Sequence, residues 1–299
     1  MDEYIQAYEY EKNVNPPLKS VPITEKHIND CSYGITFVDF SEIYNIDYKS
    51  TSPNLLASFI RVEKGKDIKF QDDSYVNGSS HLFYIINGKC EVTVDDEKYL
   101  LSTGDIMITP LFSTLTIENI ENNELQIYYI NDSPLLNYLG SKPVQKKFKT
   151  AVYSNEFLLK NLESLSDPNN NRKGILLSNK DTEKIGVNTI TPVLWALYNE
   201  LPPNTVQRPH KHNSVALDLC ISYCDPENIY TLIGNELDEC GNIIDPVRVN
   251  WEQGKMFVTP PGLWHSHNNN TGDMYAYILP IQDAGLLLYQ RILGIVLQR

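Results

Sequence analysis

The chain has 299 residues, of which 38 are acidic and 25 basic, so its formal net charge is −13 at pH 7. A hydrophobic fraction of 41% is enough for a sizeable core, and the length allows one large domain or two of ordinary size. An acidic surface repels nucleic acids and anionic membranes, so we expect neither as a partner.

The termini and the cysteines indicate a cytoplasmic protein. No apolar run is long enough to span a membrane, and the acidic segment 1–13 lacks the apolar stretch of a signal peptide. Five cysteines, an odd number without zinc-type spacing, are predicted to be reduced, buried thiols: Cys31, Cys90, Cys220, Cys224 and Cys240.

Short β-rich runs follow an N-terminal arm that we place at residues 1–50. Between about 54 and 131 these runs are NLLASFIRV, HLFYII, CEVTV, EKYLL, DIMITP, STLTIEN and ELQIYYIN. Turn signals such as Asn87–Gly88 and Thr103–Gly104 separate them. Regularly spaced short strands predict a sandwich or small barrel, here over 51–135.

A connector over 136–190 is predicted to hold one amphipathic helix. The run SNEFLLKNLESL has apolar residues at helical spacing and Ser154 as its N-cap, and a polar loop follows at 166–174. The β-rich pattern then returns over 191–299 and ends in GLLLYQRILGI, which predicts a closing helix.

The two β-rich parts are related to each other. Each ends in a strand, an Asp and a Leu-rich helix, at 130–140 and 280–294. Each also has a Gly and a Pro with five residues between them, at 104–110 and 254–260. A repeat of this size predicts two copies of one β domain.

The histidines are concentrated in the second copy. Four of the six lie there, in two pairs spaced i, i+2: His210 with His212, and His265 with His267. On a strand this spacing places both rings of a pair on the same face.

The surrounding motifs resemble those of the cupin family. PHKH (209–212) matches the H-x-H core of the first cupin motif, and GKMFVTPPGLWHSHNNN (254–270) contains the second, G-x5-P-x-G-x2-H-x3-N. The matching positions are His210, His212, Gly254, Pro260, Gly262, His265 and Asn269.

This resemblance implies an all-β protein of two tandem cupin (jelly-roll) barrels with a few helices, and a metal held by His210, His212 and His265. Three neutral imidazoles suit Fe(II), which we expect, or Mn, Ni, Cu or Zn, and they leave coordination positions open. The Glu usual in the first motif is absent, because Ala216 and Leu217 stand there.

The sequence around the motifs is similar to that of gentisate 1,2-dioxygenase-like bicupins. The resemblance implies an iron dioxygenase that cleaves a small, chelating, aromatic and anionic substrate with O2, and that forms a homodimer or larger homo-oligomer.

The N-terminal copy departs from this pattern. Its H-x-H positions fall on about Tyr75 and Asn77, its Glu position on His81 and its second-motif His on Leu115. We therefore expect a degenerate site there, a structural role for His81, and the metal centre in the C-terminal barrel.

Six further residues are candidates for the chemistry. The catalytic candidates are His267, as an acid or base, and Arg208, as an anchor for a substrate carboxylate. His267 could instead face solvent at the barrel mouth, and Arg208 could be an exposed strand-start residue. Candidates for binding substrate are Gln207, Trp264, Tyr230 and Gln282, and core packing is an alternative role for Trp264.

Two other functions remain open on the sequence alone. A metal cupin could act without O2 as an isomerase, decarboxylase or hydrolase. A bicupin could also bind a small ligand without catalysis.

Overall fold

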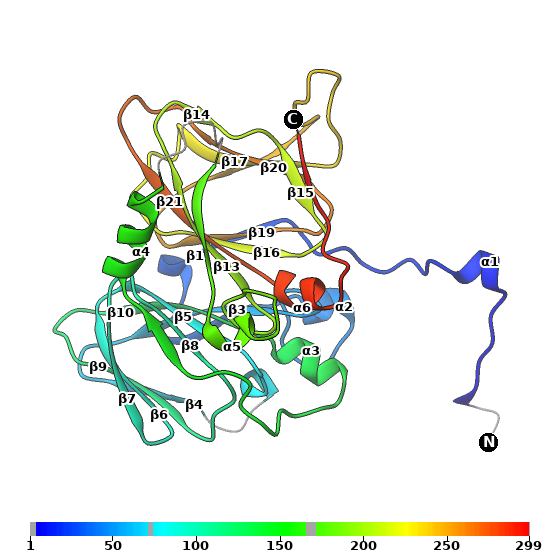
Figure 1. The fold of residues 1–299 in the computed structure, drawn as a ribbon. Coiled ribbons are helices and arrows are strands. Elements are labelled where there is room, and N and C mark those ends of the chain that lie inside the picture. Colours follow the sequence, from blue (N-terminus) through cyan, green and yellow to red (C-terminus); the bar gives the residue numbers. More distant parts are fainter. Residues whose placement is uncertain (1–3, 71–73, 166–171, 299) are drawn as a thin grey trace.

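The computed structural model describes residues 4–70, 74–165 and 172–298, and these form two β-barrels that lie one above the other in Figure 1. Residues 4–20 extend away from the barrels and include α1 (Tyr10–Asn13). None of the helices in the described ranges is long and apolar enough to cross a membrane.

The N-terminal barrel consists of two antiparallel sheets. One has the order β11-β8-β5-β10-β3-β2 and contains β2 (Gly34–Val38), β3 (Leu56–Val62), β5 (His81–Asn87), β8 (Ile106–Thr109), β10 (Leu125–Asn131) and β11 (Ala151–Tyr153). The other has the order β4-β9-β6-β7 and contains β4 (Asp67–Phe70), β6 (Lys89–Val94), β7 (Glu97–Ser102) and β9 (Leu115–Asn119).

The C-terminal barrel repeats this plan. Its first sheet has the order β1-β19-β16-β21-β13-β12, with β1 (Thr24–His27), β12 (Lys173–Leu177), β13 (Trp195–Leu201), β16 (Ala216–Cys220), β19 (Lys255–Thr259) and β21 (Ala276–Gln282). Its second has the order β18-β17-β20-β15-β22, with β15 (His210–His212), β17 (Ile229–Gly234), β18 (Val247–Asn250), β20 (Trp264–Asn269) and β22 (Ile295–Leu297), and β14 (Thr205–Val206) pairs with β20.

The helices lie between and beside the barrels. They are α2 (Ser41–Tyr44), α3 (Ser133–Tyr138), α4 (Asn155–Glu163), α5 (Lys180–Glu183) and α6 (Ala284–Tyr289), with 3-10 turns at Ile28–Asp30 and Ser74–Val76. Helix α4 confirms the predicted amphipathic helix: Ser154 caps it by accepting a hydrogen bond from the Phe157 N–H, and Leu158 and Leu162 are buried.

One hydrophobic core joins the two barrels. It is formed by the first sheet of each, and Leu82 and Ile130 of the N-terminal barrel share it with Leu217 and Leu279 of the C-terminal barrel. Side chains alternate along a strand, so Asp218 and Cys220 of β16 point away from this layer into the C-terminal barrel.

The internal repeat extends to individual hydrogen bonds. Asp132, which follows β10, accepts from the N–H groups of Ser79 and Ser80, and Asp283, which follows β21, accepts from the N–H of Val215. In both copies an Asp therefore ties the end of the last strand to the residues just before a strand of the same sheet.

Several predictions need correction. Residues 24–27 and 34–38 of the expected arm are strands β1 and β2, which pair with β19 and β3 because both edges had free hydrogen-bonding groups. The closing helix α6 ends at Tyr289, and residues 295–297 form β22 on β15. Cys240 is exposed, whereas the other four cysteines are buried, and all five are free. Of the predicted loop 166–174, residues 166–171 lie outside the described ranges, and β12 begins at Lys173.

Candidate metal centre

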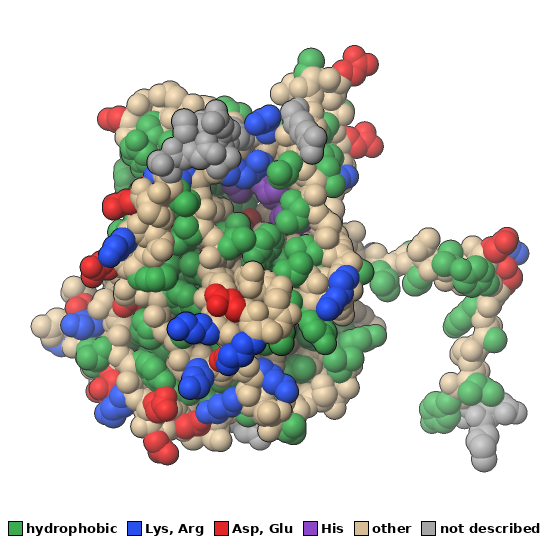
Figure 2. Space-filling view, viewed as in Figure 1, with side chains coloured by type: hydrophobic (Ala, Val, Ile, Leu, Met, Phe, Trp, Pro, Cys, Tyr) green, Lys and Arg blue, Asp and Glu red, His purple; other side chains and the backbone are tan. Residues whose placement is uncertain are grey.

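Three histidines from two neighbouring strands meet inside the C-terminal barrel. His210 of β15 lies directly opposite His265 of β20 in the antiparallel pair, and His212 follows on the same face of β15. Each of the three rings offers a nitrogen, and these nitrogens all lie within 4.8 Å of one another. Figure 2 shows histidine side chains recessed in the upper barrel, with Lys and Arg side chains nearby.

A glycine-containing bend places His265. Gly262 has φ +82°, a left-handed conformation that suits glycine, and its N–H donates to the His212 carbonyl over 2.7 Å. Gly254, before β19, also has a positive φ of +82°, and a Cβ there would lie 2.7 Å from the Ile28 side chain. These positions explain why the motif needs both glycines.

Hydrogen bonds set the tautomers of two rings. His212 Nδ1 lies 2.9 Å from the Ser214 carbonyl, and His265 Nδ1 lies 3.2 Å from the Leu263 carbonyl. A carbonyl only accepts, so each Nδ1 carries the proton and each Nε2 presents a lone pair. His212 Nε2 is buried with no hydrogen-bond partner. A buried lone pair among imidazoles fits a transition metal.

The third ring has a different partner. The Nη2 of Arg172, the residue before β12, lies 3.1 Å from His210 Nδ1. A guanidinium only donates, so His210 Nδ1 accepts this bond and the proton of the neutral ring is on Nε2. His210 is the one member of the cluster whose tautomer is set by a cation.

Burial keeps the rings uncharged. It lowers the pKa of His210 to about 2, with Arg172 as a further cause, and it lowers the pKa of His212. Burial and the neighbouring rings hold the pKa of His265 well below its usual range. Neutral imidazole is the form that binds metal ions, so the cluster needs no deprotonation at neutral pH.

His267 lies beside the cluster on the same face of β20. Its ring centroid is 5.9 Å from that of His265, and it is 5% exposed, so the solvent-facing alternative is wrong. Its Nδ1 lies 2.8 Å from the Thr231 hydroxyl, which also accepts from Trp251 Nε1 over 2.8 Å. The Thr231 hydroxyl thus holds the His267 ring and the Trp251 indole together, and it can either donate to His267 Nδ1 or accept from it.

Two of the expected substrate-binding residues connect to the histidines. Gln282 accepts a hydrogen bond from the Ser214 hydroxyl, which is itself 3.0 Å from His212 Nδ1. Gln207 is 4% exposed, and its N–H donates to the His267 carbonyl.

The other two expected substrate-binding residues, Tyr230 and Trp264, and the catalytic candidate Arg208 have other contacts. Tyr230 alternates with Thr231 along β17 and stacks under Arg248, 3.7 Å from the guanidinium carbon to the ring centroid. Trp264 alternates with His265 and stacks with Lys211. Arg208 is exposed, and its backbone carbonyl accepts from Arg172.

The interior of the N-terminal barrel is filled by its own side chains. Phe70, Phe83 and Tyr129 pack there with Leu115. His81 is fully buried, with Nδ1 2.8 Å from the Tyr129 hydroxyl and Nε2 3.3 Å from the Gly78 carbonyl, and burial lowers its pKa to about 4. Both ring nitrogens of His81 therefore have polar partners within the N-terminal barrel.

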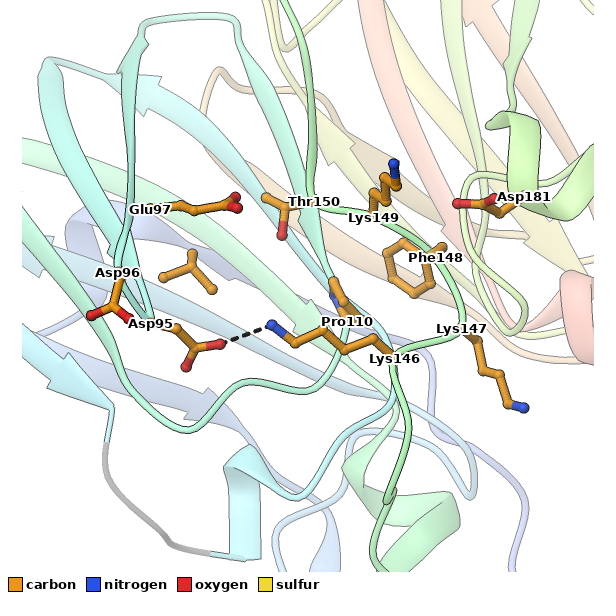
Figure 3. Close-up of a pocket in the computed structure, with 11 residues that line it drawn as sticks. Asp95, Asp96, Glu97, Pro110, Lys146, Lys147, Phe148, Lys149, Thr150 and Asp181 are labelled. Atoms are coloured by element: carbon orange, nitrogen blue, oxygen red, sulfur yellow. Dashed lines mark hydrogen bonds and ion pairs between the residues drawn. The ribbon is translucent and has the colours of Figure 1, made fainter.

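A separate cleft of about 660 Å³ lies between the β6–β7 turn and the connector (Figure 3). An ion pair between Lys146 and Asp95 crosses it, 2.8 Å from nitrogen to oxygen, and Lys147 points away from the cleft. Its lining mixes acidic, basic and apolar groups without a convergent set of polar atoms.

Sequence reasoning missed three residues of the site. Thr231 gave a signal, because it is the polar residue between Ile229 and Ile233 on the inward face of β17. Ser214 gave none, since it stands at a variable position of the first motif, and Arg172 gave none, since it lies outside the motifs and reaches His210 only through the fold.

Comparison with known proteins places this geometry in context. A family model described as Mif2/CENP-C like matches residues 52–131, from just before β3 to the end of β10 in the N-terminal barrel. No curated protein sequence matches the chain significantly. The structure is similar to a salicylate 1,2-dioxygenase from Pseudaminobacter salicylatoxidans, with a TM-score of 0.73, 12% identity, and coverage of 99% of this chain and 94% of that one.

Two further solved structures extend the comparison. A variant of the same enzyme in complex with gentisate has a TM-score of 0.73 at 12% identity and covers 97% of this chain and 91% of its own. A cupin 2 conserved barrel domain protein from Leptotrichia buccalis has a TM-score of 0.52 at 14% identity and covers 89% of this chain and 97% of its own.

The chain has the fold of a bicupin, two tandem jelly-roll barrels as predicted, with a cluster of three histidines in the C-terminal one. Among bicupins, it resembles the salicylate- and gentisate-type dioxygenases.

Proposed function

We propose that the C-terminal barrel binds one Fe(II) ion through His210, His212 and His265, and that the protein is a dioxygenase acting on a small, chelating, aromatic anion. The observation that carries the metal site is the convergence of the three ring nitrogens within 4.8 Å, with His212 Nε2 buried and unpartnered. Mn, Ni, Cu and Zn suit the same donors.

A bound iron would supply Lewis acidity and open coordination positions for the substrate and O2. The protein's own part is to hold the donors. The carbonyls of Ser214 and Leu263 keep the protons of His212 and His265 on Nδ1, which directs both Nε2 lone pairs to one place. Gln282 restrains His212 further through the Ser214 hydroxyl.

His267 is our candidate for proton transfer to a bound substrate. The Thr231 hydroxyl holds the ring through Nδ1, which leaves Nε2 as the nitrogen for proton transfer, and the ring lies beside the cluster. Gln207 is the candidate polar group for orienting substrate, since it is buried next to His267. Tyr230 and Trp264 could contribute only by moving toward the cluster, whereas a role of Arg208 stays a prediction.

The similarity to a salicylate dioxygenase and to its complex with gentisate supports an aromatic hydroxy acid as substrate class. The absence of a carboxylate from the first cupin motif supports an anionic substrate, because three neutral ligands leave the full charge of the ion uncompensated. A cytoplasmic homodimer or larger oligomer stays a prediction, as does the division at residues 50, 135 and 190.

The test is metal analysis of protein made with ample iron, followed by anaerobic titration of the Fe(II) form with salicylate and gentisate. We expect one iron per chain, a spectral shift on titration, and turnover only after O2 is admitted. His212→Ala should lose the iron and the shift, while Ser58→Ala, in the other barrel, should keep both.

Two outcomes would replace the proposal. Turnover without O2 would make the protein an O2-independent metal cupin. Metal-free wild-type protein, with ligand binding unchanged in His212→Ala, would make it a non-catalytic binding protein.

A further inference from the structure

Arg172 brings a positive charge to the histidine cluster. It precedes β12, at the edge of the first sheet of the C-terminal barrel, and its side chain spans to the second sheet. There its Nη2 donates to the Arg208 carbonyl and to His210 Nδ1. The guanidinium thus lies directly against one of the three rings.

This charge has no anionic partner within the described ranges. No carboxylate of those residues pairs with Arg172, and its Nε is buried without a hydrogen-bond partner. Arg61, in the other barrel, shows the usual arrangement, since Glu124 accepts from both its Nε and Nη2. Arg172 is half-buried, and a cation partly removed from water without an anion is costly unless a ligand completes it.

The surrounding groups do not offset the charge. The histidines are held neutral by burial, and Arg208 lowers the pKa of Arg172 further, but a guanidinium still stays protonated at neutral pH. The cluster therefore combines one fixed positive charge with three neutral donors. A metal ion would add to this positive charge rather than balance it.

The contact with His210 is also incompatible with metal binding by that ring. While Nδ1 accepts from Arg172, the proton sits on Nε2, and His210 has no second lone pair to offer. Binding of a metal by either nitrogen requires the bond to Arg172 to break. The guanidinium would then have two free donors, Nε and Nη2, on the side of the cluster.

We propose that Arg172 is the specificity-determining residue of the three-histidine site and binds the carboxylate of an anionic ligand. The planar fork of a guanidinium matches a carboxylate with two parallel hydrogen bonds, which a lysine cannot make. This inference rests on the proposed function for the metal, and it assigns to Arg172 the role that the sequence suggested for Arg208.

The test uses benzoate as the carboxylate probe and benzamide as its neutral counterpart, with calorimetry on the full chain in the metal-free and Co(II)-loaded forms. We expect Arg172→Gln to weaken benzoate binding at least tenfold and to leave benzamide binding unchanged. Arg172→Lys should keep part of the benzoate affinity. Arg248→Gln, at an exposed arginine on β18, should bind benzoate as the wild type does.

Co(II) affinity provides a second readout that is independent of activity. Since Arg172 competes for His210, Arg172→Gln should bind Co(II) at least as tightly as the wild type. The inference is overturned if Arg172→Gln binds benzoate normally, if benzamide binding falls equally, or if the variant loses Co(II). Loss of benzoate binding in Arg208→Gln alone would also overturn it.

A different result is expected if the proposed metal-binding function itself is wrong. In that case the wild type binds no Co(II), whereas the benzoate titration of the metal-free form still separates Arg172→Gln from the wild type.

Discussion

Thr231 and His267 lie directly opposite each other on β17 and β20, and the Thr231 hydroxyl is 2.8 Å from His267 Nδ1. The same hydroxyl accepts from Trp251 Nε1, so one small side chain orders an indole and an imidazole. The hydroxyl oxygen has two lone pairs, so it can accept from Trp251 and still either donate to His267 Nδ1 or accept from it.

Thr231→Val should therefore damage both stability and turnover. It keeps the shape of the side chain but leaves the Trp251 N–H buried without an acceptor, which costs about 1–3 kcal/mol of the free energy of unfolding. His267 Nδ1 also loses its hydrogen-bond partner, so the ring is no longer held in place. Chemical denaturation and steady-state kinetics check the two effects, and Thr231→Ser, which keeps the hydroxyl, should restore most of both.

Ser214→Ala should weaken metal binding without abolishing it. The variant loses the hydroxyl between His212 Nδ1 and Gln282 but keeps the Ser214 carbonyl as an acceptor. Removing an outer partner of a metal-binding histidine costs roughly tenfold in affinity at the lower end of the observed range. Competition with a chelator measures it, and an affinity equal to that of Ser58→Ala would show that the hydroxyl has no such role.

Asp218 should make stability depend on pH. It is fully buried with the Thr259 hydroxyl as hydrogen-bond partner, and burial raises its pKa to about 7. Between pH 4 and 7 the folded protein keeps a proton that the unfolded chain has lost. The free energy of unfolding therefore falls as pH rises, by about 1.4 kcal/mol per pH unit from this group, and levels off above pH 7.

Asp218→Asn removes that dependence. Its free energy of unfolding should increase relative to the wild type as pH rises from 4 to 7, measured by urea denaturation at each pH. Asp96→Asn, at an exposed carboxylate, serves as the control. Parallel pH profiles for the wild type and Asp218→Asn would contradict the prediction.

His81→Phe should affect the fold and spare the metal. Losing the bonds to Tyr129 and Gly78 costs about 1–3 kcal/mol at pH 7. The pKa of His81 is about 4 in the folded protein, below its usual value of 6.5, so the wild type loses stability from this group as pH falls from 6.5 to 4. Phe does not titrate, so His81→Phe does not lose stability in this way as the pH falls. Metal content per chain should be unchanged, and a lower value would assign His81 a role in binding.

Local sequence patterns predicted most strands of the N-terminal barrel and the start of helix α4. Alternating or continuous apolar runs marked β3, β5, β6, β7, β8, β9 and β10 in chain order, and the Ser154 cap marked the start of α4. Strand β1 and strand β22 were missed because each is short and gains its hydrogen bonds only from a distant strand edge. Their existence depends on the fold and not on their own residues.

The candidate metal centre could also be predicted only in part. The i, i+2 spacing predicted that His210 and His212 share a face, and the structure brings His265 to them. Arg172 could not be predicted, because its sheet-edge position is set by the pairing of β12 with β13. For Tyr230 and Trp264, the candidates for binding substrate, the sequence did not give the direction of the side chain, since strand register decides which neighbour faces the interior.

The apolar layer shared by the two barrels gives the N-terminal half a part in the chemistry of the other half. Neither first sheet can open to water without exposing its counterpart, so the polypeptide should melt in one step. A destabilising substitution in the N-terminal barrel would then lower the iron occupancy of the C-terminal barrel. The interior of the N-terminal barrel is filled by its own side chains, but this barrel would still support turnover by packing against the first sheet of the other.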